Sequence, residues 1–449
     1  MYTRFRHAMQ NSAFKDVKIM DIKGNPAQGL AGATLGFFIG FAAVSLFGPT
    51  VGFLKEEGGI SPALAGLLIS IPNLSGSLLR IPFSAMVDTT GGRKPFLTLL
   101  VISILGVLGL AVLITTAGEN IGLFYPWLLA FGILAGCGSA TFSVGISQTS
   151  YWFPQRQQGT VLGIYAGIGN LAPGFFALLI AAVTLPLFGL AGSYYVWMAL
   201  LVLGTLGYAL LGRNAWYFQL LNGGYSPSEA KKTAMEAHGQ ELFPKAKVSE
   251  SLLHSAKSWQ TWALVVVYFC TFGGFMALTG WLPKYWISYH GVELALAGGL
   301  TALYSLSASL TRVVGGRFSD KFGGGRAALL SLSTTLIGAL IIGFTSALQL
   351  AILGVVLMAL GMGVCNAAVF KLVPQEIPDA IGGAAGWVGG LGAFGGFVMP
   401  NLLAFFVTKF SSNIGYARGF LSFVVLATLS ALMIFLINAF GLKARGRKV

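Results

Sequence analysis

The sequence predicts an all-α integral membrane protein in which twelve transmembrane helices form two six-helix halves. Three observations carry this prediction. Hydrophobic residues make up 55% of the 449 residues and charged residues only 9%, against about 25% charged residues in a typical soluble chain. Apolar stretches long enough to cross a bilayer recur along the whole chain. A sequence pattern of the first half returns in the second.

The predicted spans fall into two groups of six. A spanning helix needs about 20 mostly apolar residues. In the first half such stretches lie at 28–50, 61–87, 96–116, 124–148, 160–184 and 191–212. In the second half they lie at 260–284, 294–316, 327–347, 349–371, 383–409 and 416–441. The predicted domain order is a tail at 1–27, a half at 28–212, a polar linker at 213–258, a half at 259–441 and a basic tail at 442–449.

The basic residues predict the orientation of the spans. With the N-terminus in the cytoplasm, 22 of the 28 Lys and Arg residues fall on the cytoplasmic side and 4 on the outer side, which is the usual bias of membrane proteins. The net charge of +14 therefore reflects topology, and we expect no nucleic-acid partner. We predict a multi-pass protein of the cytoplasmic (inner) membrane with both termini in the cytoplasm.

An internal repeat relates the two halves. The second span ends LLRIPFSAMVDTTGGRK, and the eighth ends LTRVVGGRFSDKFGGGR. In each, an arginine precedes an aspartate by eight positions: Arg80 and Asp88 in the first half, Arg312 and Asp320 in the second. Twelve spans in two parallel repeats resemble the major facilitator superfamily, in which the substrate site lies near the midplane between the halves.

The loops after these two spans resemble the cytoplasmic loop motif of that superfamily. They run from Asp88 to Arg93 and from Asp320 to Arg326, with glycines between. We expect the glycines to form turns and each loop arginine to be an ion-pair partner. We also expect the loops to stabilise the state that is closed toward the cytoplasm.

Two arginines lie deep in the predicted membrane. Eight helical residues rise about 12 Å, so Arg80 and Arg312 fall near the middle of a hydrocarbon layer about 30 Å thick. In the predicted topology none of the 14 acidic residues and 4 histidines lies at that depth. Because intramembrane charges normally face a cavity or an opposite charge, the pair predicts a bound anion. The alternative is that each arginine snorkels or caps backbone carbonyls.

The predicted midplane around the arginines is aromatic, and we expect a tight apolar cavity there. Phe41, Phe142, Tyr268, Phe272 and Asn170 all fall inside spans. A phenylalanine in a span packs more often than it binds a ligand, so an anion held between aromatic faces is a hypothesis from shape alone. Asn170 is a buried amide that needs hydrogen-bond partners.

Two glycine-rich stretches, at 159–174 and 382–396, lie within apolar spans. This context excludes phosphate-binding loops. The glycines favour close helix crossing or flexing as the halves move, and both interpretations stay open. The candidates for conformational gating in these stretches are Gly163, Gly167, Gly169, Gly386, Gly389, Gly390 and Gly392.

The chain resembles the nitrate/nitrite porters of the major facilitator superfamily. The resemblance rests on SGSLLRIPFS around Arg80, on LTRVVGGRFSD around Arg312 and on the two glycine-rich stretches. FAAVSLFGPTVGF, SATFSVGIS and VYFCTFGGF, which begin at Phe41, Ser139 and Val267, add to it. The match covers essentially all of the spans.

This resemblance implies roles for the candidate residues. Arg80 and Arg312 would clamp a planar anion between the halves. Phe41, Phe142 and Phe272 would surround it, and Tyr268 and Asn170 would be its other hydrogen-bonding neighbours. The tenth span departs from the pattern, because it brings Lys371, Pro374 and Glu376 to its cytoplasmic end. The resemblance assigns no role to these three.

The implied function is secondary transport of nitrate, nitrite or both by alternating access, without enzymatic activity, cofactor or metal. Two like charges in an empty closed site are costly at low dielectric, which favours exchange of nitrate for nitrite. A proton carried by Glu376 or by water would instead give proton symport, and both mechanisms stay open. A transporter for another small anion, a channel or sensor, and a membrane enzyme are weaker alternatives. We expect a monomer.

Overall fold

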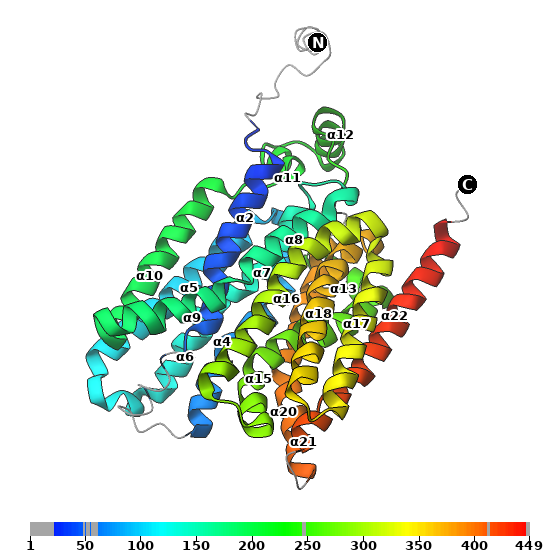
Figure 1. Cartoon of the computed structure of the whole chain (residues 1–449). Helices are drawn as coiled ribbons and strands as arrows, with labels where there is room; N and C mark the ends of the chain where they lie inside the picture. The colour runs from blue at the N-terminus through cyan, green and yellow to red at the C-terminus, as the bar shows by residue number, and fades with distance from the viewer. Residues whose placement is uncertain are drawn as a thin grey trace, which may run out of the picture.

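The computed structural model describes residues 22–47, 50, 54, 62–244, 248–410 and 414–445. The regular elements in these ranges are helices, and no strand occurs among them. The helices stand side by side in one bundle (Figure 1). The start of the described chain lies at one end of it, together with α11 (Trp216–Asn222) and α12 (Pro227–His238). We call this the linker end, and the opposite end the far end.

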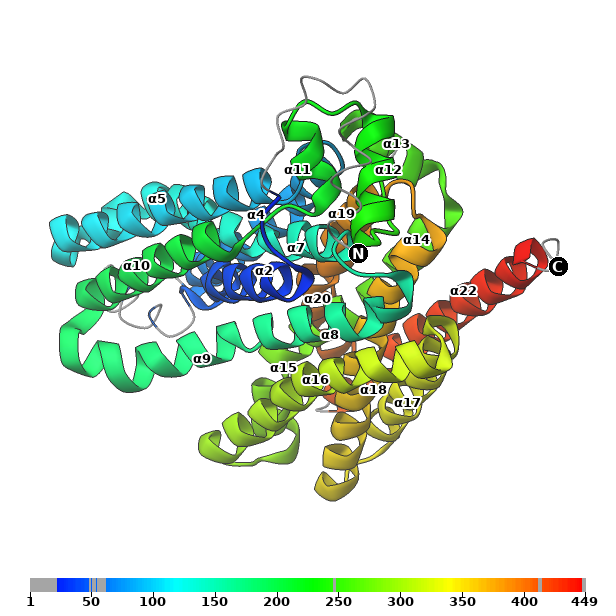
Figure 2. The same ribbon diagram turned by 90° about the horizontal axis from the view of Figure 1, so that it is seen from above.

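The first half supplies one group of helices. In chain order they are α2 (Pro26–Phe41), η1 (Ala42–Ser45), α4 (Pro62–Thr90), α5 (Arg93–Ala117), η2 (Gly118–Phe124), α6 (Tyr125–Gly136), η3 (Cys137–Ala140), α7 (Thr141–Ser150), η4 (Gln155–Gln157), α8 (Gln158–Gly169), α9 (Ala172–Leu179), η5 (Ile180–Thr184) and α10 (Leu185–Leu211). Seen from above, α2, α5 and α10 lie on the left of the molecule (Figure 2).

The second half supplies the other group. It consists of α14 (Trp259–Tyr268), η6 (Phe269–Gly273), α15 (Gly274–His290), α16 (Leu294–Phe322), α17 (Gly324–Phe344), α18 (Leu348–Glu376), α19 (Ile381–Ala393), α20 (Gly395–Lys409), α21 (Ile414–Arg418) and α22 (Leu421–Arg445). In the same view α17, α18 and α22 lie on the right, so the two groups face each other across the molecule (Figure 2).

The polar linker is folded. Besides α11 and α12 it contains α13 (Val248–Lys257). A capping box starts α12, in which Ser226 and Glu229 bond reciprocally. The hydrogen bonds from Ser226 lower the pKa of the Glu229 carboxyl group. Helix α13 contacts both halves, because Ser251 bonds to Asp88 of α4 and accepts from the backbone N–H of Gly383 in α19.

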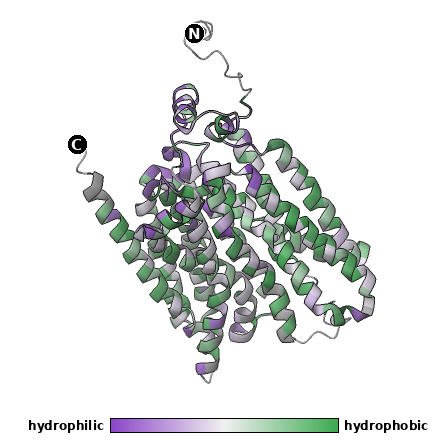
Figure 3. Ribbon diagram, turned by 180° about the vertical axis from the view of Figure 1, so that it is seen from behind, coloured by the Kyte–Doolittle hydropathy of each residue, from purple (hydrophilic) through white to green (hydrophobic). Residues whose placement is uncertain are grey.

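The described chain is built to lie in a bilayer. Nine of its helical stretches are long and apolar enough to cross a membrane. They coincide with nine of the predicted spans, and the other three predicted spans correspond to α4, to α16 and to α8 with α9. The total of twelve spans stays a prediction. Apolar residues cover the length of the bundle, and polar ones gather at the linker end (Figure 3).

Several helix boundaries differ from the predicted ones. Helices α4, α16, α18 and α22 continue three to six residues past the predicted span ends, because hydropathy marks the membrane-embedded part of a helix and not the polar turn that follows it. The predicted spans at 160–184 and 383–409 are each broken, after Gly169 and at Phe394. The predicted N-tail falls largely outside the described residues, as do Lys55, Glu56 and Glu57.

Candidate functional site

Arg80 projects from α4 into the interior between the halves. Its side chain is 2% exposed. Its Nη1 donates to the carbonyl of Gly389 in α19 (3.0 Å), and its Nη2 donates to the carbonyl of Ser139 in η3 (3.4 Å). Its Nε has no hydrogen-bond partner in the described structure. The Arg80 guanidinium therefore joins the two halves through the carbonyl of Gly389. This agrees in part with the alternative stated above, in which each arginine donates to backbone carbonyls.

Arg312 of α16 occupies the equivalent place in the second half. It is 1% exposed, and its Nη2 donates to the hydroxyl of Tyr268 (3.3 Å). Its Nε and Nη1 are buried, and neither has a partner among the described residues. Buried donors without acceptors are costly, so this guanidinium is the less satisfied of the two.

Neither arginine is paired with a carboxylate in the described parts of the chain, where Lys371 and Asp320 form a partly buried ion pair with each other. Two buried guanidinium groups thus place two positive charges in the interior. Burial of an unpaired charge is strongly unfavourable unless a counter-charge is bound. The arrangement fits an anion from outside the protein.

Both guanidinium groups lie against the same two aromatic rings. The Arg80 Cζ is 4.9 Å from the centroid of Phe142 and 5.6 Å from that of Phe272. The corresponding distances for Arg312 are 5.3 and 5.7 Å. The two rings are stacked, with centroids 5.8 Å apart. The charge is therefore held at ring faces, where a cation is attracted electrostatically. The structure brings Arg80, Arg312, Phe142 and Phe272 together, as expected.

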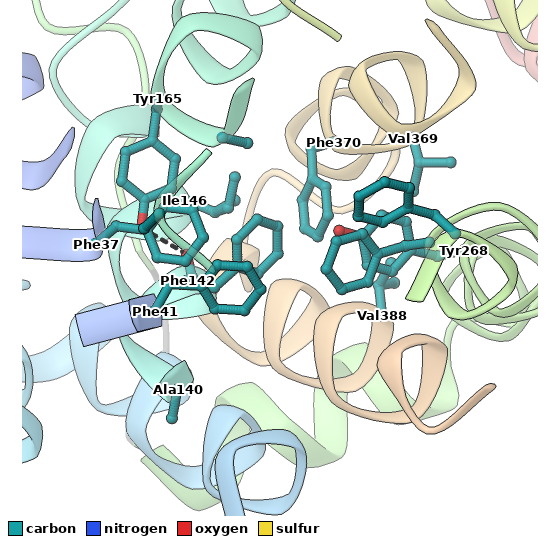
Figure 4. Close-up of a cluster of buried hydrophobic side chains, with 14 of the residues drawn as sticks. Phe37, Phe41, Ala140, Phe142, Ile146, Tyr165, Tyr268, Val369, Phe370 and Val388 are labelled. Carbon is teal, nitrogen blue, oxygen red and sulfur yellow. Dashed lines mark hydrogen bonds between the residues drawn. The ribbon is translucent and has the colours of Figure 1, made fainter. Parts of the chain in front are cut away.

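Tyr268 belongs to the same cluster. Its ring stacks on Phe272 at 4.8 Å, and its hydroxyl accepts from Arg312. Figure 4 shows Phe142 beside Phe37, Phe41 and Tyr165 on one side of the cluster and Tyr268 beside Phe370 on the other. The rings from the two halves thus meet where the arginines lie.

Phe370 was not singled out in the sequence. It comes from α18, packs edge-on against Phe142 (5.2 Å) and Tyr268 (4.9 Å), and lies 5.9 Å from the Arg312 Cζ. A glycine pattern before it does not mark it, because Phe142 follows Gly-Cys-Gly (136–138) by four positions and Phe370 follows Gly-Met-Gly (361–363) by seven.

Asn170 is placed differently from the other candidates. It forms the C-cap of α8 at the break before α9. It is buried, and its Oδ1 has no hydrogen-bond partner in the described structure. It does not line the cavity at Arg80, whereas Phe41 does. No hydrogen bond joins Asn170 to either arginine among the described residues.

The glycine-rich stretches cross the helices that carry the arginines. A Cβ on Gly163 of α8 would lie 2.9 Å from the carbonyl oxygen of Arg312, and one on Gly386 of α19 would lie 2.7 Å from that of Ile81. Such distances leave no room for a side chain, so close crossing between the halves is observed. Gly167 and Gly390 face the same two partner helices, while Gly169, Gly389 and Gly392 face Phe37, Ser143 and Tyr268.

A cavity of about 400 Å³ adjoins Arg80. Its lining residues on α4 run from Leu67 to Arg80, away from Asp88, so it extends from the arginine toward the far end. The cavity is larger than a four-atom anion needs, and it contains the polar side chains of Asn73, Ser77 and Asn401. The sequence predicts a tight apolar cavity at the midplane, and the cavity that continues from Arg80 toward the far end is wider and includes these polar side chains.

At the linker end the two motif aspartates bond across the halves. Asp88 accepts from the Tyr151 hydroxyl (2.6 Å), from Ser251 and from the backbone N–H of Gly382 in α19 (3.0 Å). Asp320 accepts from the backbone N–H of Gly159 (2.9 Å) and Thr160 (2.6 Å) at the start of α8. Each carboxylate therefore meets the N-terminal end of a helix of the other half, where anions are favoured.

The motif arginines are not the partners of these aspartates, contrary to expectation. Arg93 donates to the carbonyl of Ala209 (2.8 Å), and no ion pair joins Arg326 to Asp320 in the described chain. Lys371 of α18 pairs with Asp320 instead. Each loop arginine is separated from its aspartate by a turn. The carboxylates instead accept hydrogen bonds from backbone N–H groups at the starts of α8 and α19. Lys371, to which the sequence assigned no role, thus belongs to the contact region between the halves.

Comparison with known proteins places this architecture. Residues 33–400 match the family model of the Major Facilitator Superfamily. The chain belongs to this superfamily. Solved structures of other members of this superfamily have a similar fold. One is the proton:xylose symporter XylE, with a TM-score of 0.71 and 13% identity, covering 92% of this chain and 95% of that one. FucP in its outward conformation is another (TM-score 0.63, 15% identity, 90% and 98%). At these identities the likeness concerns the fold alone.

Curated members of the superfamily narrow the assignment. The chain is 31% identical over 396 residues to a probable nitrate/nitrite antiporter NarK1 of Thermus thermophilus, with 83% of each chain covered. It is 28% identical over 391 residues to a probable nitrate transporter NarT of Staphylococcus epidermidis, covering 87% of this chain and 91% of that one. Membership of the nitrate/nitrite porter family, expected from the sequence, is confirmed, and the members of this superfamily are transporters.

Proposed function

We propose that this protein is a secondary transporter that moves nitrate, nitrite or both across the cytoplasmic membrane by alternating access. The observation that carries the proposal is the pair of buried arginines. Three of their nitrogen atoms lack an acceptor in the described structure, and no carboxylate neutralises them there. The names of the relatives above, which span most of the chain, support the substrate.

The chemistry of the site suits a small planar oxyanion. A guanidinium group is always charged and presents its N–H donors in one plane. The oxygens of nitrate or nitrite would accept from donors among the three atoms without partners, which are Arg312 Nε, Arg312 Nη1 and Arg80 Nε. The stacked rings of Phe142 and Phe272 would exclude water around the bound anion. Phe41, Tyr268 and Asn170 stay candidate neighbours of the substrate.

The conformation is consistent with an outward-facing state if the linker end lies in the cytoplasm. There the halves are joined through Asp88 and Asp320, whereas the cavity beside Arg80 extends toward the far end. The excess of Lys and Arg in the predicted cytoplasmic segments supports this orientation, with both termini in the cytoplasm. Residues 28–212 and 259–441 would then rock about the glycine crossings, with Asp88, Arg93, Asp320 and Arg326 as gating residues.

Exchange of nitrate for nitrite is the coupling that the site favours. Without an anion the two arginines repel each other, so an occluded empty site is unfavourable. The halves would then change conformation mainly when loaded. Proton symport is the second candidate, and the buried carboxylate of Asp88 at the linker end is the observation in its favour. We also propose that the protein acts as a monomer.

Counterflow in proteoliposomes tests this proposal. Nitrate is added outside vesicles that contain nitrite or no permeant anion, with a pH-sensitive dye inside. We expect uptake only into nitrite-loaded vesicles, without a change of internal pH. Uptake into empty vesicles with acidification would replace exchange by proton symport. Absence of nitrate uptake under both conditions would overturn nitrate transport itself.

A further inference from the structure

The cavity beside Arg80 contains polar side chains that the arginine pair leaves without a role. Asn73, Ser77 and Arg80 line it from α4. Their spacing of four and three residues places them on one face of the helix, and the rise from Asn73 to Arg80 is about 10 Å. Asn401 of α20 lines the same cavity from the second half. Together they form a polar path that leads inward to the arginine.

These side chains have hydrogen-bonding capacity to spare. Ser77 is 8% exposed, and no partner for its hydroxyl group is found among the described residues. The same holds for the amide of Asn73. Asn401 donates one N–H to the carbonyl of Phe397 (2.8 Å), which leaves its second N–H available. Three polar groups in a largely apolar cavity thus keep donors that no acceptor in the described structure engages.

An anion entering this cavity needs such donors. The anion loses hydration as it moves toward Arg80, which is buried, and burial without compensating hydrogen bonds is costly. Arg80 does not offer both of its Nη atoms to an arriving anion, because Nη1 and Nη2 already donate to the carbonyls of Gly389 and Ser139. Neutral amide and hydroxyl donors bind a monoanion more weakly than a guanidinium does, which suits a site from which the anion must move on.

We infer that Asn73, Ser77 and Asn401 form an outer binding subsite for a small monovalent oxyanion, occupied before the anion reaches Arg80 and Arg312. This inference rests on the proposed transport of nitrate and nitrite. Because Asn73 and Asn401 belong to different halves, the subsite exists in the conformation seen here, in which the far end is open. The outer subsite helps to bind an anion that arrives from the far side. It has no effect on an anion that binds from the linker side.

The test compares the two sides of the membrane. Asn73→Leu and Asn401→Leu remove the amides at similar volume. Nitrate uptake into nitrite-loaded right-side-out membrane vesicles gives the KM from outside, and nitrite-loaded inside-out vesicles give the KM from the linker side. We expect the outside KM to rise about fivefold to tenfold, which is the effect of losing one hydrogen bond of ordinary strength. The linker-side KM should change less than twofold.

Matched variants make the result specific. Leu74→Ala alters the same cavity wall without removing a donor, and its outside KM should stay within twofold of wild type. Asn73→Gln keeps the amide and should recover most of the affinity, which also controls for folding. If both amides hold one anion, the double variant should show less than the product of the two single effects.

The other outcomes each decide the question. Equal changes of KM on both sides would assign Asn73 to the central site and overturn the outer subsite. Unchanged outside KM in both amide variants, with normal protein levels, would overturn it as well. A wild-type protein that transports neither nitrate nor nitrite would overturn the proposed function, and that result is distinct from the first two.

Discussion

The two halves repeat the same two charged positions but give them different partners. In the first half Arg80 donates across the interface to Gly389, and the Asp88 carboxylate is held by neutral donors. In the second half Arg312 donates within its own half, to Tyr268, and Asp320 is paired with Lys371. The charged residues therefore occupy equivalent positions in the two halves, but their hydrogen-bond and ion-pair partners differ.

This difference teaches that the halves contribute unequally to substrate binding and to closure. Arg312 has two nitrogen atoms without partners and Arg80 has one, so the second half offers more free donors to an anion. The first half instead offers a guanidinium that already bridges the interface. We expect Arg312 to dominate binding and Arg80 to couple binding to movement of the halves.

The largest effect should come from the arginines. Lysine keeps the charge and loses the planar fork. A hydrogen bond to a charged group contributes about 1.5–3 kcal/mol, so we expect Arg312→Lys to lower kcat/KM for nitrate about 100-fold and Arg80→Lys about 10-fold. Counterflow rates over a range of nitrate concentrations measure both. A larger loss of kcat/KM in Arg80→Lys than in Arg312→Lys, or uptake at the wild-type level by either variant, would contradict the unequal roles of the two arginines.

The glycine crossings should behave alike in the two halves. Gly163→Ala and Gly386→Ala each add a methyl group that meets a backbone carbonyl oxygen at 2.9 and 2.7 Å. Because backbone cannot yield as a side chain does, the halves must separate, and we expect about a tenfold loss of transport rate in both. Initial rates of nitrate uptake at matched protein amounts measure this loss.

Gly174→Ala is the control for these two variants. A Cβ at Gly174 finds no atom within 4 Å, so its transport rate should match that of the wild type. Loss of transport in only one of the crossing variants would show that the two crossings differ in function, despite their similar geometry.

A smaller effect on transport should come from the contacts of Asp88 and Asp320 at the linker end, and it should differ between the two. Lys371→Met leaves the Asp320 carboxylate without its cation at the interface. Loss of one partner of a buried pair is destabilising, and we expect the linker end to open more often and transport to fall severalfold. Labelling of a Thr89→Cys variant by a membrane-impermeant thiol reagent in inside-out vesicles reports that opening.

Removal of the uncompensated charge should reverse this change. The combined Lys371→Met and Asp320→Asn variant should label more slowly than Lys371→Met alone. Tyr151→Phe removes a neutral donor from Asp88 and should raise labelling less than Lys371→Met does. If Tyr151→Phe has the larger effect, the ion pair is not what distinguishes the second half.

The smallest effect should come from Asn170, which has no equivalent amide at Ala393 in the second glycine-rich stretch. Its Oδ1 lacks a partner, but it does not line the cavity at Arg80. We expect Asn170→Ala to change the ratio of nitrate to nitrite affinity about twofold to threefold, with normal protein levels. Competition of nitrite against nitrate uptake measures the ratio, and an unchanged ratio would leave Asn170 with a packing role.

Much of the site could be predicted because hydropathy and sequence repetition act locally. The offset between Arg80 and Arg312 marks equivalent positions, and depth in an apolar span follows from counting residues along a helix. The same counting placed Phe142, Phe272 and Tyr268 inside spans, whereas their place beside the anion was implied by the family resemblance. Phe370 was missed because phenylalanine is common in spans and its role depends on which helix faces which. Lys371 was found but not explained for the same reason.

The sequence by itself determined the membrane class, the two related halves and the demand for an anion at two deep arginines. These follow from composition and from the cost of charge in an apolar layer. Only the tertiary structure decided which groups satisfy each charge. Arg80 and Gly389 are 309 positions apart, and Lys371 and Asp320 are 51 apart. Such pairs are set by how helices cross, and a crossing depends on the fit of whole surfaces.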